Sequence, residues 1–596
     1  SRYQSLIEGA IKPQWALLGA TFIAICSFLP LYLAPASVAE IVKPLFVVLA
    51  VSLGLSWILA LCQTTTFGNF ILKEAVPGGA MKDPYDTKLY HKFEKFLTLL
   101  IKRRFVTLTT VFVTLVLSLV IMAVMPQSFF PKMNKPYFRA DLVFPEGFSI
   151  HAVDQDVMKV EGYLKNHEKV KSYSVTLGGT PLRYYLASSS FGPKSNYANV
   201  MVETKDPEDA AEVEQQFYEH MTQNFPNIIT RSALFALSPV PEAAIEIGFI
   251  GENPDTLTAL VERAKKIARQ CDMVTDIRSN WGDKVPVWKP MFSQQKGLRL
   301  GITRQQVANS FRTATNGLPL GEYREGDVSL PILLKDEDVE KMNLNDVKSV
   351  PVFSTKGNSV KVEQVIDNFA LGYDYNVVRR FNRERCMMMQ CEPRRGANTM
   401  AAFKQVLTAV QEQMRLPEGY KMKYFGEQET QDVSNAALAK NIPLTFLLIY
   451  VVLLFLFPSN YRKPVLIMLM LPLVFIGVVW GLLLFGKSLD FFAILGLLGL
   501  IGMNIKNAIV LVDEIGLQLK DGKGAVPAVV EATKTRIVPV TMASGTTILG
   551  MLPLLGDAMF AGMAATIMGG LFVSTVLTIF VLPVTYCIFF KIRADR

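Results

Sequence analysis

The sequence has few residues of the kinds that build metal sites, disulfide frameworks or nucleotide-hydrolysing sites. Its four histidines are scattered and its six cysteines lack metal-ligand spacing, so we expect no zinc site and no disulfide framework. Its glycine-rich segments lack the G-x-x-x-x-G-K-[ST] spacing of a P-loop. The sequence therefore predicts neither an enzyme nor a bound cofactor.

A continuous basic tract is also missing. The net charge is +9, but the lysines and arginines gather beside the ends of apolar runs. That distribution is typical of membrane topology rather than of nucleic-acid binding, and we expect no nucleic-acid partner.

Long apolar runs are abundant. Half of the 596 residues are hydrophobic, and a helix needs about 20 mostly apolar residues to cross a bilayer. Eight windows satisfy this: 15–34, 41–62, 105–125, 441–457, 464–486, 491–513, 537–555 and 562–590. Residues 126–440 are too many for a loop and must form a folded domain.

Basic residues predict the orientation of these spans. Outside the large domain, almost all of them lie in the segments before the first window, between the second and third, and after the fourth, sixth and eighth. The opposite segments hold only Lys43 and Lys487. The positive-inside rule then places both termini in the cytoplasm and the large domain in the periplasm of a bacterial inner membrane.

The large domain contains an internal repeat. The stretch RADLVFPE, the helix AVDQDVMKVEGYLKN and the strand VKSYSVTLGG are echoed by AIEIGFIGE, DTLTALVERAKKIARQ and VTDIRSNWG. The alternation between strand and helix periods predicts ferredoxin-like βαβ units, the second of which is interrupted and resumes at RCMMMQCEP. The predicted domains are a cytoplasmic or interfacial segment 1–14, two transmembrane helices in 15–62, a cytoplasmic linker 63–104, a transmembrane helix 105–125, a first periplasmic subdomain 126–240, a second one formed by 241–281 and 381–440, an insert 282–380, five transmembrane helices in 441–590 and a cytoplasmic tail 591–596. Within that scheme, KDGKGAVPAVVEATKTR is expected to form a short amphipathic helix on the cytoplasmic surface.

Several motifs resemble the inner-membrane permease of resistance-nodulation-division (RND) efflux pumps of the type that exports hydrophobic and amphiphilic compounds. They are GMNIKNAIVLVDE, RIVPVTMAS, MPQSFFP after the third span, KGLRLGITRQQV at the start of the insert, and IMGGLFVSTVLTIFVLPV. The resemblance implies a polytopic α-helical membrane protein with eight spans here and twelve in the full protein. It also implies an α+β periplasmic domain of two ferredoxin-like porter subdomains and a docking insert.

The resemblance further implies a secondary transporter that is driven by H+ antiport. Such a permease works as a homotrimer with a periplasmic adaptor and an outer-membrane channel, and it exports drug-like compounds. Because the chain starts at Ser1 and matches spans five to twelve, we expect an N-terminal half that lies outside this sequence.

Lys506 is the foremost candidate for a functional residue. An ionisable side chain inside hydrocarbon is costly and usually functional, and in the family the matching lysine pairs with carboxylates on the fourth span. The alternative is that Lys506 snorkels toward the cytoplasmic end. No acid lies in the core of any predicted span, and the nearest ones stand at span ends or in adjoining loops: Glu40, Asp490, Asp513, Glu514 and Asp557. Its partner is therefore expected outside this chain.

Four further residues are candidates for the proton relay. Asn507 adds polarity beside Lys506, and Thr541 and Ser544 lie on the next span. Family members commonly place a threonine where this sequence has Ala543, so the two hydroxyls serve either the relay or only their own helix carbonyls. Arg536 belongs either to the relay or to the positive-inside anchors.

Two other stretches have both a functional and a structural interpretation. The loop TPLRYYLASSSFGP offers Tyr184, Tyr185 and Phe191, which border a substrate pocket by resemblance or merely pack on the sheet. The tract CMMMQC, residues 386–391, suggests a copper or silver exporter or else a strand with core methionines. A membrane scaffold or sensor that transports nothing is the remaining alternative.

Overall fold

The computed structural model describes residues 2–592 except 12–13, 35–36, 72–84, 86, 129–133, 185–192, 236–241, 338–345, 355–356 and 459. The chain divides into two compact units. One comprises residues 1–280 and 380–596, and the other comprises residues 281–379. The first unit contains the apolar helices and both repeat copies, and the second corresponds to the stretch that was interpreted from the sequence as an insert.

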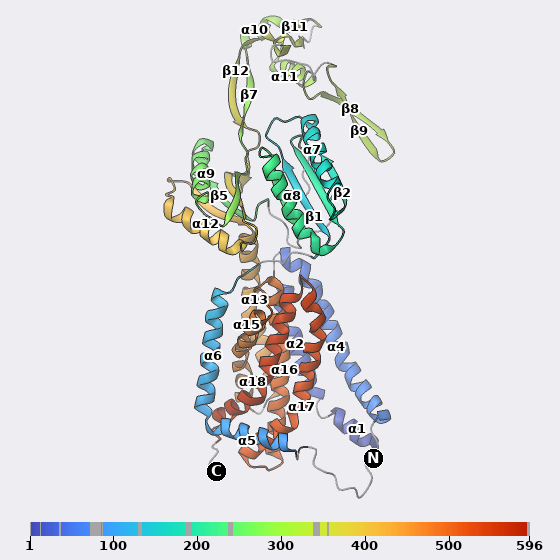
Figure 1. The fold of residues 1–596 in the computed structure, drawn as a ribbon, viewed down its shortest axis with the longest axis vertical. Helices are drawn as coiled ribbons and strands as arrows, with labels where there is room; N and C mark the ends of the chain where they lie inside the picture. Colours follow the sequence, from blue (N-terminus) through green and yellow to red (C-terminus); the bar gives the residue numbers. More distant parts are fainter. Residues whose placement is uncertain are drawn as a thin grey trace. The chain divides into compact units, whose positions relative to one another are not determined.

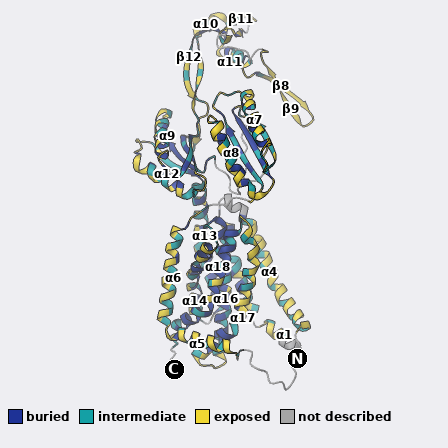
Figure 2. Ribbon diagram, in the orientation of Figure 1, coloured by how far each residue is buried: buried dark blue, intermediate teal, exposed yellow. Residues whose placement is uncertain are grey.

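Eight segments of the described chain are long and apolar enough to cross a membrane: Leu6–Leu33, Val42–Ile71, Arg104–Val124, Glu427–Leu456, Arg462–Leu484, Phe491–Lys520, Ala525–Gly556 and Ala561–Phe589. The helices that form these segments or adjoin them are α1 (Arg2–Ile11), α2 (Gln14–Ser27), α3 (Leu29–Leu33), α4 (Ser37–Ile71), α5 (Lys88–Lys102), α6 (Arg104–Val124), α13 (Glu427–Leu456), α14 (Arg462–Leu469), α15 (Val474–Leu484), α16 (Phe491–Lys520), α17 (Ala525–Met551) and α18 (Ala561–Phe589). Helices α16 and α18 are buried along most of their length, whereas α4 and α6 are largely exposed (Figure 2).

Helices α15 and α18 pack with their backbones in close approach. A Cβ atom at Gly481 would lie 2.7 Å from the carbonyl oxygen of Ala565 and 2.8 Å from Cα of Gly569. Small residues allow such packing, which supplies van der Waals contact where lipid provides little hydrophobic driving force between helices. The buried centre of this bundle includes Leu482, Leu500 and Leu571.

The first ferredoxin-like unit is complete within the described residues. Its elements are β1 (Tyr137–Val143), α7 (Ile150–Lys165), β2 (Val170–Leu177), β3 (Tyr197–Thr204), α8 (Ala210–Asn224) and β4 (Ile229–Leu234). The strands form an antiparallel sheet of order β2-β3-β1-β4. Alternate residues of β1, among them Phe138 and Leu142, pack against Val157 of α7 and Phe217 of α8 to form its core.

The second ferredoxin-like unit has the same strand arrangement as the first, but it is assembled from two distant stretches of sequence. Its elements are β5 (Ile245–Ile250), α9 (Pro254–Ala268), β6 (Val274–Ser279), β13 (Arg380–Phe381), β14 (Glu384–Pro393), α12 (Thr399–Gln413) and β15 (Lys421–Gly426). Strand β14 pairs with β6 and β5, and β15 pairs with the other edge of β5. The chain therefore leaves the sheet after β6 and returns to it at β14.

Helix α13 begins at the residue that follows β15. Gly426 joins them with a φ of 81°, and a Cβ atom there would lie 2.8 Å from the carbonyl oxygen of Ala244. Glycine suits this position because other residues disfavour positive φ and have no room. The predicted span at 441–457 is thus the second half of a longer helix that is continuous with the sheet (Figure 1).

The smaller unit is built around a two-stranded ribbon of β7 (Lys284–Phe292) and β12 (Ile366–Tyr375). It also contains α10 (Gln294–Leu300), α11 (Arg304–Thr313), the hairpin β8 (Leu318–Glu325) and β9 (Val328–Leu334), and the short strands β10 (Pro351–Phe353) and β11 (Ser359–Lys361). Its core includes Ile302, Val307, Val352 and Val362.

The structure corrects the expectation for one segment that was predicted to be cytoplasmic and adds helices to another. Residues 520–536 do not form a separate amphipathic helix, because Ala525 begins α17, which runs unbroken past Pro539 to Met551. The predicted linker 63–104 is largely helical where it is described, since α4 continues to Ile71 and α5 occupies Lys88–Lys102.

Candidate functional site

A buried polar network joins α16, α17 and α18 in the apolar bundle. Asn504 accepts a hydrogen bond of 2.5 Å from Ser574, and Thr575 donates one of 2.6 Å to Ser544. The amide of Asn507 lies 3.5 Å from the Ser544 hydroxyl, at the outer limit of a hydrogen bond. All five side chains are buried, so helix periodicity has turned the polar residues inward toward one another.

Lys506 lies on the other side of the same helix. Between Phe491 and Leu519, the structure leaves only Lys506 and Leu517 exposed. Their spacing of eleven residues is about three helical turns, which places both on one face of α16. No hydrogen bond or ion pair within the described part of the chain involves Lys506. The lysine therefore faces outward from this chain, next to a network that faces inward.

The two hydroxyl candidates on α17 have different environments. Ser544 is buried in the network, where it accepts the hydrogen bond from Thr575. Thr541 is exposed, and its hydroxyl donates to the carbonyl oxygens of Ile537 at 2.6 Å and Val538 at 3.0 Å. Thr541 thus bonds to carbonyl oxygens of its own helix, which is the alternative to a role in the proton relay.

Arg536 lies at a different level and has its own partner. Its Nε and Nη2 atoms donate to Oε2 of Glu514 at 3.1 and 2.5 Å, and Gln518 donates to Oε1 at 2.8 Å. The Glu514 side chain is only 11% exposed. This corrects the expectation that Glu514 stands at a span end, because α16 continues to Lys520 and buries it. Glu514 is paired with Arg536 and lies about two helical turns from Lys506.

The aromatic loop is described only in part. Tyr184 is 38% exposed, and its ring lies 5.9 Å from that of Phe235. Tyr185 and Phe191 lie outside the described residues. The structure thus shows one of the three predicted pocket residues, in contact with an aromatic side chain near the end of β4.

The CMMMQC tract forms most of β14. Cys386 and Cys391 are fully buried and fall on opposite faces of the strand. Burial raises the pKa of the Cys386 thiol to about 11 and that of Cys391 to about 12. Both thiols are therefore protonated near neutral pH, whereas metals bind the thiolate form.

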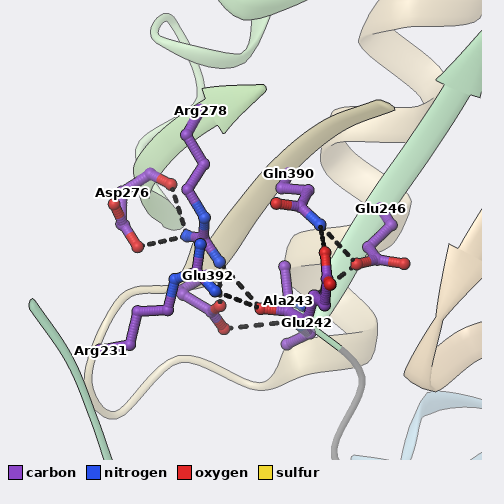
Figure 3. Close-up of polar contacts among 9 residues, drawn as sticks. Arg231, Glu242, Ala243, Glu246, Asp276, Arg278, Gln390 and Glu392 are labelled. Atoms are coloured by element: carbon purple, nitrogen blue, oxygen red, sulfur yellow. Dashed lines mark hydrogen bonds and ion pairs between the residues drawn. The ribbon is translucent and has the colours of Figure 1, made fainter. Parts of the chain in front are cut away.

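A second polar cluster, which sequence reasoning missed, lies where the two ferredoxin-like units meet (Figure 3). Arg278 of β6 is paired with Asp276 and donates to Glu392 of β14 at 3.2 Å. Its Nη2 also donates to the carbonyl oxygen of Glu242 at 2.9 Å, and Arg231 of β4 reaches that same oxygen at 3.4 Å. Arg231 of the first ferredoxin-like unit therefore reaches the charged cluster of the second ferredoxin-like unit.

The other half of this cluster is acidic. Gln390 donates to Glu246 at 2.8 Å and to Glu242 at 3.3 Å, so one amide group bridges two carboxylates. Burial raises the pKa of Glu246 to about 7, and the charge of Glu242 adds to that shift while Arg278 opposes it. Glu246 is paired in the sheet with Phe425, the residue before Gly426. This titratable group thus lies at the junction between the sheet and α13.

A reciprocal contact joins the same two units elsewhere. Arg395, after β14, donates two hydrogen bonds of 2.5 Å to the carboxylate of Glu214 on α8, and its guanidinium lies over the ring of Tyr218. Glu214 also accepts a hydrogen bond of 2.5 Å from Ser232. The two ferredoxin-like units are thus bridged by an ion pair here, and by the hydrogen bond of Arg231 to a backbone carbonyl oxygen at the first place.

The comparisons with known proteins agree with this architecture. A family model described as the AcrB/AcrD/AcrF family matches residues 2–590. The multidrug export protein AcrF of Escherichia coli is 23% identical over 602 residues, which is 96% of this chain and 57% of AcrF. The swarming motility protein SwrC of Bacillus subtilis is 22% identical over 615 residues, which is 100% of this chain and 56% of SwrC.

Metal-resistance proteins are also similar. The nickel and cobalt resistance protein CnrA of Cupriavidus metallidurans is 27% identical over 360 residues, which is 59% of this chain and 33% of CnrA. A crystal structure of a heavy metal efflux pump superposes with a TM-score of 0.77 at 17% identity, over 97% of this chain and 58% of that chain. At that identity the likeness shows the fold alone. The chain spans a little over half the length of the relatives that cover nearly all of it.

Proposed function

Since the chain belongs to the AcrB/AcrD/AcrF family of RND permeases, we propose that it is the C-terminal part of a proton-driven efflux transporter. In this proposal the chain supplies one half of the coupling site and one half of the periplasmic substrate path. It acts by moving between conformations, as a secondary transporter, and performs no chemical conversion.

The observation that best supports proton coupling is the contrast between Lys506 and its neighbours. Asn504 and Asn507 are buried and have polar partners inside the bundle, whereas Lys506 points out of a helix that is otherwise almost entirely buried. A lysine at membrane depth needs an anionic partner or a route to water. A second half of the protein, packed against this face, would supply carboxylates whose protonation releases Lys506 and changes the packing of α16.

Asn507 and Ser544 then transmit that change rather than move the proton. They link α16 to α17 and α18, and their long contact of 3.5 Å is weaker than the bond of 2.6 Å between Thr575 and Ser544. A small shift of α16 would break the weaker contact first. Arg536 is assigned a structural role, because Glu514 already neutralises it.

We propose hydrophobic or amphiphilic organic compounds as the substrates. AcrF and SwrC align with essentially the whole chain, and AcrF is by its name a multidrug export protein. Cys386 and Cys391 fall on opposite faces of β14, which argues against a soft-metal site shared by the two thiols. Tyr184 is the described candidate for an aromatic contact with such substrates.

Metal export is the second candidate, because CnrA has the higher identity over a shorter stretch. In either case the proposed assembly is a homotrimer in the inner membrane, with its large domain in the periplasm. An adaptor and an outer-membrane channel would complete it. A scaffold that transports nothing remains the alternative from another class.

The substrate class is tested with the chain joined to its N-terminal half in cells that lack their own efflux pumps. We expect lower accumulation of a cationic dye, with no change in resistance to nickel, cobalt, copper or silver. Metal resistance without dye export would overturn the substrate proposal and favour the second candidate. No effect on either, at normal expression, would favour a scaffold.

A further inference from the structure

Helix α5 is amphipathic and packs across the end of the helix bundle. It buries Phe93, Leu97 and Ile101, and the rings of Phe93 and Phe96 lie 5.6 and 5.4 Å from that of Phe580 on α18. The chain bends at Arg103, so α5 lies across the bundle end while α6 runs along the bundle (Figure 1). The packing leaves the opposite side of α5 uncovered.

The depth of α5 follows from the start of α6. Helix α6 begins at Arg104, and the next two residues, Phe105 and Val106, are 70% and 63% exposed. Such apolar residues at the start of a membrane span lie in hydrocarbon, whereas arginines before them lie at the headgroups. Since α5 ends two residues earlier, at Lys102, it lies at the level of the lipid headgroups.

The uncovered side of α5 combines basic and apolar residues. Lys88, Lys92, Lys95 and Lys102 are exposed, and their spacing of four, three and seven residues places them on one helix face. Leu89 and Leu99 lie beside or among them and are 72% and 48% exposed, and Phe96, whose ring contacts Phe580 along one edge of this side, is still 49% exposed. Within the described part of the chain, none of the four lysines forms an ion pair.

We propose that this side of α5 is a docking surface for anionic phospholipids. Lysines at the headgroup level attract lipid phosphates, and the apolar side chains beside them reach the acyl boundary of the same lipids. A free phosphate ion would satisfy the lysines but not the exposed leucines and phenylalanine. The surface therefore fits a molecule that is anionic at one end and apolar at the other.

The position of α5 links this surface to the candidate site. Helix α5 contacts α17 and α18, the helices that hold Ser544 and Thr575. Lipid bound to α5 is thus placed to bias the packing of the network. The proposal depends on membrane insertion and not on export, so its failure would leave the proposed function untouched.

The competing explanation is that these lysines only determine topology. A topology signal acts during insertion and requires no lipid selectivity in the folded protein. The two explanations therefore differ in whether the purified, folded chain binds anionic lipid in preference to neutral lipid.

The test is native mass spectrometry of the full chain in detergent, titrated with phosphatidylglycerol or phosphatidylcholine. We expect the chain to retain phosphatidylglycerol preferentially. The variant K88Q/K92Q/K95Q/K102Q should lose that preference, because each lysine near anionic lipid contributes about a fivefold change in affinity at low salt. Glutamine keeps the helix propensity close to that of lysine.

A matched control removes four exposed lysines from elsewhere in the chain: K205Q/K335Q/K348Q/K404Q. It should bind phosphatidylglycerol like the parent chain. If the fourfold variant fails to fold, K95Q alone should still weaken binding about fivefold. Undiminished phosphatidylglycerol binding by the folded α5 variants would overturn the proposal, as would equal loss in the control or full competition by inorganic phosphate.

Discussion

Replacing Arg536 by methionine should destabilise the bundle, because we assign Arg536 to a structural ion pair and not to the proton relay. Two donor atoms of Arg536 meet one oxygen of Glu514, whose side chain is 11% exposed. Removing one partner of a buried ion pair costs about 3–5 kcal/mol. The arginine is 36% exposed, so water screens the pair and we expect a loss of about 2 kcal/mol for Arg536→Met.

The matched variants make that expectation specific. Glu514→Gln should cost about 1 kcal/mol, because Arg536 then keeps access to water, and the double variant should lose about 1 kcal/mol less than the sum. Lys506→Met should leave stability unchanged in this chain. The assay is unfolding in mixed micelles of dodecyl sulfate and maltoside, followed by circular dichroism. Additive losses, or an unchanged Arg536→Met variant, would refute the assignment of Arg536 to a structural pair.

Two further predictions concern packing and pH. Gly481→Ala should destabilise the contact between α15 and α18 by about 1–3 kcal/mol in the same unfolding assay, because its Cβ would lie 2.7 Å from a backbone oxygen. The control Gly54→Ala should not destabilise the protein, because a Cβ atom there would have nothing within 4 Å. Equal effects of the two substitutions would contradict this prediction. Because burial raises the pKa of Glu246 from 4.5 to about 7, the fold favours its protonated form, and β5 should lose about 3 kcal/mol of stability as pH rises between these values. Hydrogen exchange of the β5 amides measures this loss, which Glu246→Gln should abolish; the same pH slope in that variant would exclude Glu246 as its cause.

The sequence predicted features that depend on local periodicity. Polar residues within an apolar run made Lys506 and Asn507 candidates, and helical spacing accounts for their facing different sides of α16. Both copies of the βαβ pattern were visible because alternating and helical periods follow each other in the same order. The insert was interpreted as residues 282–380, and the structure divides the chain at residues 281 and 379.

Features that depend on distant pairing were not accessible in the same way. The ion pair between Glu514 and Arg536 joins two helices, and it is also what allows α16 to bury an acid beyond the predicted end of its span. The cluster around Arg278 and Glu246 combines strands that are separated by more than a hundred positions. The alternation of β14 placed its cysteines, but only packing shows that both are buried.

The most direct measurement is proton-gradient-dependent dye export by the complete protein, comparing the parent with Lys506→Met. The chain joined to its N-terminal half should export, and the chain alone should not, because no described acid pairs with Lys506. Lys506→Met should abolish export at unchanged expression, stability and assembly. Export by that variant, or by this chain without its other half, would contradict the coupling role assigned to Lys506.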